Sequence, residues 1–155
     1  MSDPGDETAI RKTLVVDAPT ERAFRVFSQN MGSWWPKQHH IGKSPLKECV
    51  VEPRPGGRWY EVGEDGSQCE WGKVLTWDPP RRLVLAWQLD ENFTYDASLI
   101  TEVEVSFTVL EPTRTRVDFE HRNLERFGAA AARLRTLMGD GWAGILDAFA
   151  RATRA

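Results

Sequence analysis

The feature that most constrains the fold of this chain is a series of short alternating segments between residues 46 and 121. Turn sequences interrupt the series at RPGG (54–57), EDGS (64–67), DPPRR (78–82) and EPTR (111–114). Such clusters of glycine, proline and acidic residues favour turns between strands. In residues 101–109 and 114–120, apolar side chains alternate with polar ones. This period of two is typical of strands with one buried face, so the region is predicted to be an antiparallel meander.

Helical patterns flank the meander. Residues 9–17 alternate as a further strand, and the segment after Pro19 carries its apolar side chains on one side, as a short helix does. A second short helix is expected before Pro36. Beyond residue 128, apolar residues recur at spacings of three and four, which predicts a long terminal helix.

Three glycines, Gly139, Gly141 and Gly144, fall inside this predicted terminal helix. Each costs about 1 kcal/mol relative to alanine in a helix. Either the helix is broken there, or a glycine face is needed where backbone or ligand approaches closely.

A sheet with one apolar face and a helix with one apolar stripe bury those surfaces against each other. We therefore predict an α+β helix-grip arrangement. In it a curved antiparallel sheet of about six to seven strands wraps around the C-terminal helix, and two short helices follow the first strand. A chain of 155 residues suits one domain. The domain is expected at residues 9–155, with residues 1–8 as a flexible tail.

Charge and hydropathy exclude several classes of partner. The net charge is −3, with 20 basic and 23 acidic residues spread along the chain, so no nucleic-acid partner is expected. No apolar run approaches the roughly 18 residues of a membrane span, and we expect a cytoplasmic protein without membrane insertion. The two cysteines, Cys49 and Cys69, are expected to be reduced, buried thiols.

Tryptophan is unusually abundant for a small chain. The seven tryptophans are Trp34, Trp35, Trp59, Trp71, Trp77, Trp87 and Trp142. Each can bury on the order of 150–250 Å². The number of tryptophans therefore indicates either an aromatic core or an aromatic-lined pocket.

The histidines lack the spacing of a metal site. His39 and His40 are adjacent, so their side chains point apart in an extended segment, and no HxxxH, HxH or CxxC sequence is present. We expect no metal and no cofactor. No serine or cysteine lies in a recognised nucleophile motif. His121 falls on the apolar side of its strand, either as a hydrogen-bonded core residue or as a functional group.

Several segments, in this order, resemble the START-like (SRPBCC) superfamily with the helix-grip fold. More narrowly, they resemble homologues of the C-terminal domain of the activator of heat-shock protein 90 ATPase. These segments are VVDAPTERAFRVF, WW at 34–35, PGGRWYE at 55–61, DG at 65–66, WGKVLTWDPPRRLVLAW at 71–87 and GWAGIL at 141–146.

The resemblance implies a cavity between the sheet and the terminal helix. Members of the superfamily carry lipids, sterols, polyketides, hormones or other hydrophobic molecules, and some are cyclases or hydrolases. The activator has a separate N-terminal domain that does much of its chaperone binding. There is no room for this domain before residue 9, so chaperone activation by this chain is not expected.

We therefore predict that the chain binds a hydrophobic or aromatic small molecule in this cavity. Plain core packing is the alternative for each lining residue. The predicted lining is Trp34, Trp35, His39, His40, Trp59, Glu61, Trp71, Trp87, Phe107, Phe119, His121, Leu137, Met138, Gly141 and Trp142.

Two alternative functions remain open at this point. One is a cofactor-free enzyme of the cyclase or hydrolase type, with Glu61, His121 and either His39 or His40 as proton-transfer groups. The other is an interaction module linked to a chaperone or stress pathway. Phe93 and Tyr95 are candidates for a flap over the opening or for a protein contact, including a homodimer.

Overall fold

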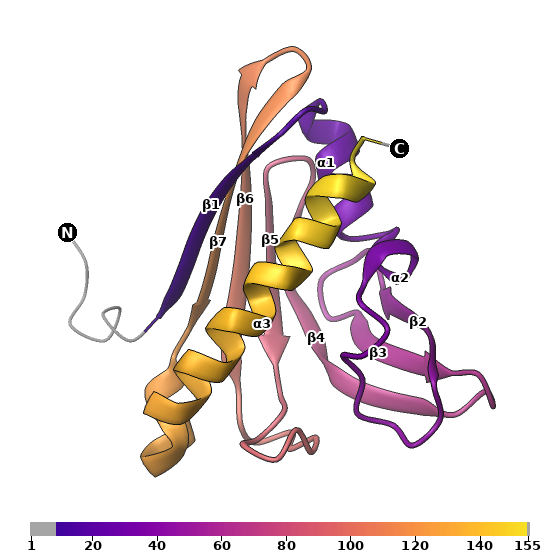
Figure 1. Cartoon of the computed structure of the whole chain (residues 1–155), viewed down its shortest axis with the longest axis vertical. Helices are drawn as coiled ribbons and strands as arrows, with labels where there is room; N and C mark the ends of the chain where they lie inside the picture. Colours follow the sequence, from indigo (N-terminus) through magenta and orange to yellow (C-terminus); the bar gives the residue numbers. More distant parts are fainter. Residues whose placement is uncertain (1–8, 155) are drawn as a thin grey trace.

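The computed structural model describes residues 9–154, which form the predicted α+β helix-grip fold (Figure 1). The strands are β1 (Ile10–Val16), β2 (Leu46–Val51), β3 (Arg58–Gly63), β4 (Gln68–Asp78), β5 (Arg82–Trp87), β6 (Thr101–Glu111) and β7 (Arg114–Arg122). The helices are α1 (Thr20–Phe27), α2 (Met31–Trp34) and α3 (Ala131–Ala152), with a 3₁₀ segment η2 (Leu124–Ala130) before α3. The predicted tail, residues 1–8, lies outside the described residues.

Within residues 9–154 the strands form one seven-stranded antiparallel sheet in the order β1-β7-β6-β5-β4-β3-β2. β1 pairs with β7, from Ile10 opposite His121 to Val16 opposite Thr115. α1 and α2 carry the chain from β1 to the other edge of the sheet, where β2 lies. Figure 1 shows the sheet curling around α3, with α1 beside the C-terminal end of that helix.

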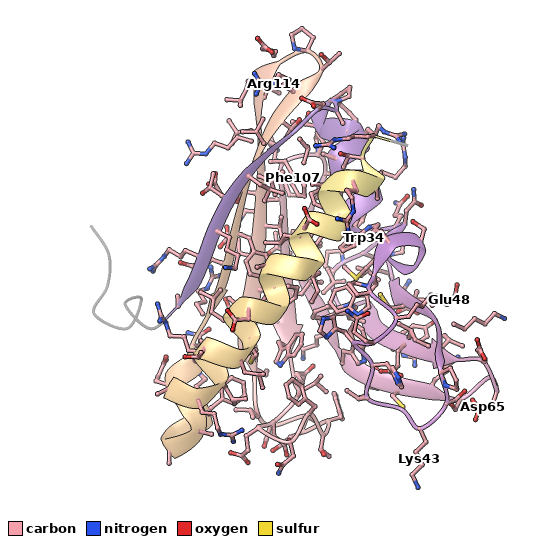
Figure 2. The ribbon with its side chains drawn as sticks, viewed as in Figure 1. Trp34, Lys43, Glu48, Asp65, Phe107 and Arg114 are labelled. Atoms are coloured by element: carbon pink, nitrogen blue, oxygen red, sulfur yellow. The ribbon has the colours of Figure 1, made fainter. Side chains whose placement is uncertain are left out.

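The alternating pattern places one face of the sheet in the core. β6 buries every second residue from Thr101 to Phe107, and β7 buries every second residue from Thr115 to His121. The predicted inward direction of His121 is therefore confirmed. Figure 2 shows Phe107 in the space between the sheet and α3, whereas Arg114 lies at the outer tip of the β6–β7 hairpin.

α3 is continuous from Ala131 to Ala152, so of the two alternatives for its glycines the broken helix does not occur. The chain changes direction earlier, at Gly128, whose φ of 62° and ψ of −130° interrupt the helical geometry. The buried residues of α3 recur at helical spacing and are Leu134, Met138, Trp142, Ile145, Leu146 and Phe149. No helix in the described part of the chain, α3 included, has the length and apolarity that a membrane span requires.

The two short helices contact each other and pack against the core. α1 buries Phe24 and Phe27 on its apolar side, as the sequence predicts. Trp34 in α2 donates a hydrogen bond of 2.6 Å from Nε1 to the carbonyl oxygen of Val26. Phe27 also packs against Phe149 of α3, with ring centroids 5.1 Å apart. These contacts determine where the segment after α2 leaves the core.

Cys49 and Cys69 lie on the two strands that flank β3. Cys49 is opposite Glu61, and Glu61 is opposite Cys69. Neighbouring strands are about 4.8 Å apart, so the two cysteines are about 10 Å apart, whereas a disulfide needs Cα atoms within about 7 Å. Both thiols are free, as predicted, although only Cys49 is fully buried.

Candidate functional site

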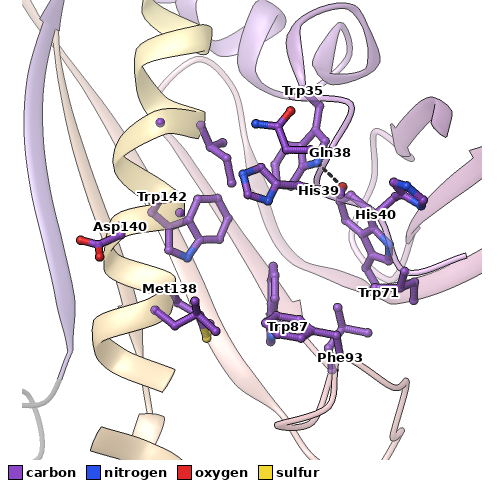
Figure 3. A pocket seen from close by; sticks show the side chains of 16 residues that line it. Trp35, Gln38, His39, His40, Trp71, Trp87, Phe93, Met138, Asp140 and Trp142 are labelled. Carbon is purple, nitrogen blue, oxygen red and sulfur yellow. Dashed lines mark hydrogen bonds between the residues drawn. The ribbon is translucent and has the colours of Figure 1, made fainter. Parts of the chain in front are cut away.

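A pocket of about 620 Å³ opens between α3 and the segment that follows α2 (Figure 3). Its wall also includes β4, β5 and the loop after β5. The volume is typical of small-molecule sites, which span roughly 300–1,000 Å³. Nine residues of the predicted lining contribute to the wall: Trp35, His39, His40, Trp71, Trp87, Leu137, Met138, Gly141 and Trp142.

Four of these residues are tryptophans whose indoles contact one another around the pocket. The ring centroids of Trp35 and Trp71 are 5.0 Å apart, and those of Trp35 and Trp142 are 5.9 Å apart. Trp87 and Trp142 follow at 5.7 Å. Aromatic pairs at these distances attract each other in tilted or edge-to-face geometry, so the wall is held in shape before any ligand enters.

Six residues of the predicted lining lie in the core and do not reach the pocket surface: Trp34, Trp59, Glu61, Phe107, Phe119 and His121. Trp142 covers Phe119, with ring centroids 4.6 Å apart. Trp59 lies against both Trp71 and Trp87 and is completely buried. An alternating pattern identifies the inward face of a strand, but it does not show which inward side chain another one covers.

The pocket wall also includes seven residues that were not part of the predicted lining: Gln38, Ile41, Leu89, Phe93, Asp140, Gly144 and Ile145. Gly144 and Ile145 lie one helical turn after Gly141, so the helical spacing contained a signal for them. Phe93, the flap candidate, does lie at the pocket, while Tyr95 is 41% exposed. The Phe93 backbone N–H donates to the carbonyl oxygen of Asp90 at 2.9 Å, which closes the turn that carries its ring.

Glu61 lies behind the wall and holds two parts of it in place. Its side chain is 1% exposed. Oε1 accepts hydrogen bonds from the Ile41 backbone N–H at 2.6 Å and from Trp71 Nε1 at 2.9 Å. Oε2 accepts one from the Gly42 backbone N–H at 3.0 Å. The buried carboxylate therefore determines both the path of the segment after α2 and the orientation of the Trp71 indole.

The two adjacent histidines point in different directions. His40 Nδ1 lies 2.9 Å from the carbonyl oxygen of Gly42, so Nδ1 carries the proton of that hydrogen bond. The carbonyl oxygen of His39 accepts a hydrogen bond of 2.8 Å from Trp35 Nε1. Figure 3 shows the His39 imidazole pointing across the pocket toward Trp142, whereas the His40 imidazole points away from α3. Burial lowers the pKa of His39, which keeps its imidazole neutral at neutral pH.

His121 belongs to a buried hydrogen-bond chain beneath the pocket. Trp142 Nε1 donates to His121 Nδ1 at 3.1 Å, so the proton of the neutral ring is on Nε2. The Nε2–H group donates a hydrogen bond of 2.8 Å to Thr101 Oγ1. Burial lowers the pKa of His121 to about 3. His121 is therefore neutral and orients Trp142, and it does not contact the pocket as a proton-transfer group.

Metal binding has no support in this part of the molecule. Within residues 9–154, no three His, Cys, Asp or Glu side chains come together in a group that could hold a metal ion. The groups available for chemistry at the pocket are the indole surfaces, the His39 imidazole that faces the pocket and a few polar groups at the rim.

Comparisons with known proteins agree with this architecture. The sequence model of the family described as activator of Hsp90 ATPase homolog 1-like protein matches residues 17–154. No match was found among curated proteins. The protein NE0264 from Nitrosomonas europaea is 17% identical, covers 98% of each chain and has a TM-score of 0.71, which shows a shared fold.

Two solved structures are more similar in sequence. Txn09, described as an anthrahydroquino-gamma-pyrone synthase complexed with SUM, is 36% identical, with 85% of this chain and 87% of that chain covered and a TM-score of 0.61. CalC from Micromonospora echinospora, described as a self-sacrificing resistance protein, is 29% identical. The CalC match covers 94% of this chain and 93% of that chain, with a TM-score of 0.69.

Proposed function

Because this chain belongs to the family of activator of Hsp90 ATPase homolog 1-like proteins, within the START-like helix-grip superfamily, we propose that it binds a flat aromatic molecule in the pocket between the sheet and α3. The observation that carries the proposal is the wall of four tryptophans whose rings contact one another in the series Trp71, Trp35, Trp142 and Trp87. Indole faces attract aromatic rings in stacked or edge-to-face geometry. The description of Txn09 as a synthase of a fused-ring aromatic product supports the same class of ligand.

Binding should be visible in the tryptophans themselves. Titration with a hydroxyanthraquinone or a flavonoid should quench the emission of the wall tryptophans and raise the melting temperature with ligand concentration. A ligand at about 100 times its dissociation constant should stabilise the protein by about 2.7 kcal/mol. A broad panel of flat aromatic compounds that causes neither quenching nor stabilisation would contradict the proposal.

Leu137 offers a variant that tests the location of the site. It lines the pocket and is 51% exposed, so Leu137→Gln should weaken binding without unfolding the protein. Leu75 is 36% exposed on β4 and does not line the pocket, so Leu75→Gln is the matched control. Equal affinities of the two variants would place the ligand elsewhere.

A second candidate function is a cofactor-free cyclase reaction in the same pocket. The His39 imidazole favours it: this ring faces the pocket and is neutral, and the hydrogen bond that fixes the residue uses the backbone carbonyl oxygen. His39 can therefore accept a proton from a bound phenol or activated methylene. Glu61 and His121 do not contribute to this reaction, since both lie behind the wall.

His39→Gln separates catalysis from binding. If the protein is an enzyme, this variant should lose turnover of a polyketide-type substrate and keep its affinity for the product. Unchanged turnover in His39→Gln would remove His39 from the mechanism. The family name refers to a chaperone activator, but a chaperone contact is not proposed for this chain, whose distinguishing feature is a small-molecule pocket.

A further inference from the structure

Trp87 is the pocket tryptophan whose indole N–H lacks an acceptor. The Nε1 atoms of the other three donate to His39 O, Glu61 Oε1 and His121 Nδ1. Trp87 is 8% exposed, and among the described residues its buried Nε1 has no hydrogen-bond partner. A buried donor without an acceptor is unfavourable. The pocket therefore contains a donor that an acceptor on a ligand can satisfy.

Met138 is a flexible side chain of the pocket wall that lies at the same end of the pocket as Trp87 (Figure 3). The Nε1 atom of Trp87 is covered by neighbouring side chains. Methionine is unbranched and changes rotamer easily, so it can move aside when a ligand enters. Trp59 Nε1 is also unpaired, but Trp59 lies behind the wall and does not line the pocket.

Another part of the pocket wall is a section of α3 without a side chain. Gly144 lines the pocket, and a Cβ atom built on it would meet nothing within 4 Å. Packing within the protein therefore does not require glycine there, although glycine lowers helix stability relative to alanine. At Gly141, by contrast, such a Cβ atom would lie 4.0 Å from His39 Cε1. Gly144 is exposed, so α3 leaves open space at this part of the pocket wall, which a ligand can occupy.

The charges of the wall restrict the ligand further. Among the described residues that line the pocket, the only carboxylate is that of Asp140, and there is no arginine or lysine. A fatty-acid carboxylate inside the pocket would find no cation in this wall to pair with. A neutral ring system with carbonyl oxygens needs no such cation.

We propose that Trp87 and Gly144 determine the specificity of the pocket: the ligand is a neutral fused-ring aromatic ketone that lies against α3 at Gly144 and accepts a hydrogen bond from Trp87 Nε1. This inference rests on the proposed aromatic-binding function. It adds to that function the polar group that the ligand carries and the part of α3 against which the ligand lies.

The test of the Trp87 contact compares two probes of the same shape. A hydroxyanthraquinone has the ring carbonyl oxygens, and the corresponding hydroxyanthracene lacks them. Isothermal titration calorimetry, which does not depend on tryptophan emission, should give the ketone an affinity roughly 3–10 times higher. Trp87→Phe removes the donor and keeps an aromatic ring, so this ratio should fall toward one. Trp77→Phe is the control, since Trp77 packs against Phe24 away from the pocket.

The test of Gly144 separates stability from binding. Gly144→Ala should raise the melting temperature by about 2–4 °C, because alanine favours the helix. Gly144→Leu should weaken binding of the hydroxyanthraquinone by roughly tenfold, because its side chain fills the space along α3. Gly139 lies on the same helix outside the pocket, and a Cβ there also meets nothing within 4 Å. Gly139→Ala and Gly139→Leu should therefore leave the affinity unchanged.

The outcomes distinguish this inference from the function on which it rests. If the unaltered protein binds neither probe, both the aromatic-binding function and the inference fail. If the unaltered protein binds both probes with equal affinity, or if its preference for the hydroxyanthraquinone persists in Trp87→Phe, the Trp87 contact is overturned while aromatic binding stands. Tight binding of the hydroxyanthraquinone to Gly144→Leu would likewise overturn the role of Gly144.

Discussion

Glu61→Gln should destabilise the domain and loosen one wall of the pocket. The carboxylate accepts three hydrogen bonds, from the N–H groups of Ile41, Trp71 and Gly42. Glutamine has one carbonyl oxygen and one NH₂ group, so at least one of these three donors will face another donor. If Oε1 keeps its two partners, the NH₂ group replaces Oε2, which lies 3.0 Å from the Gly42 nitrogen.

The magnitude follows from the contacts that change. An unpaired buried N–H costs about 1–3 kcal/mol, and hydrogen bonds to a neutral oxygen contribute about 1 kcal/mol less than those to a charged one. Removal of a buried negative charge offsets part of this loss. We therefore expect a loss of about 2–4 kcal/mol in the free energy of unfolding. For a domain of this size each kcal/mol lowers the melting temperature by about 2–4 °C.

Two measurements check this prediction. Urea denaturation should show the loss of stability, and amide hydrogen exchange should become faster at Ile41 and Gly42, which lose their acceptor or have it weakened. The amide of Ala23, which donates to the carbonyl oxygen of Pro19 in α1, should keep its protection. Glu64 is exposed in the turn after β3, so Glu64→Gln is the matched control and should change stability by less than about 0.5 kcal/mol. Unchanged stability together with unchanged exchange at Ile41 and Gly42 would refute the role of Glu61.

Two further predictions concern the buried titratable groups. Burial lowers the pKa of His121 to about 3, below its value of 6.5 in an unfolded chain. The unfolded chain therefore binds one more proton between these values, and stability should fall by about 1.4 kcal/mol per pH unit as the pH drops below 6.5. The free energy of unfolding, measured by denaturation between these pH values, should fall more steeply in the unaltered protein than in His121→Asn. Parallel plots of stability against pH for the two proteins would contradict this prediction. Burial also raises the pKa of the Cys49 thiol, so a thiol reagent should label the native protein at Cys69 and reach Cys49 only on unfolding. Native labelling that persists in Cys69→Ser would contradict this order.

Local patterns were sufficient to predict most of the fold. The alternation in residues 101–121 predicts which side chains of β6 and β7 face α3, because successive side chains of a strand point to opposite faces. Spacings of three and four after residue 128 predict the buried stripe of α3 for the same kind of reason. The resemblance of separate segments to the START-like superfamily added how these elements assemble.

The candidate site was predicted only in part. Trp87 and Trp142 line the pocket as expected, but Phe119 and His121 face the same way and are covered by Trp142. Leu137, predicted as part of the apolar stripe, is half exposed at the pocket. A periodic pattern predicts which way a side chain points. It does not predict whether side chains from other elements cover that residue, because this depends on their sizes.

The sequence by itself determined the elements, their buried faces and the supply of aromatic side chains, since these depend on residues close together in the chain. Only the tertiary structure decided which of His39 and His40 faces the pocket. It also decided that Glu61 is a buried acceptor for backbone N–H groups about twenty residues away in the sequence. The structure likewise showed that Trp87 alone among the pocket tryptophans of residues 9–154 lacks an acceptor. Hydrogen bonds and coverage between distant segments depend on how the sheet curls around α3, and no local pattern contains that curvature.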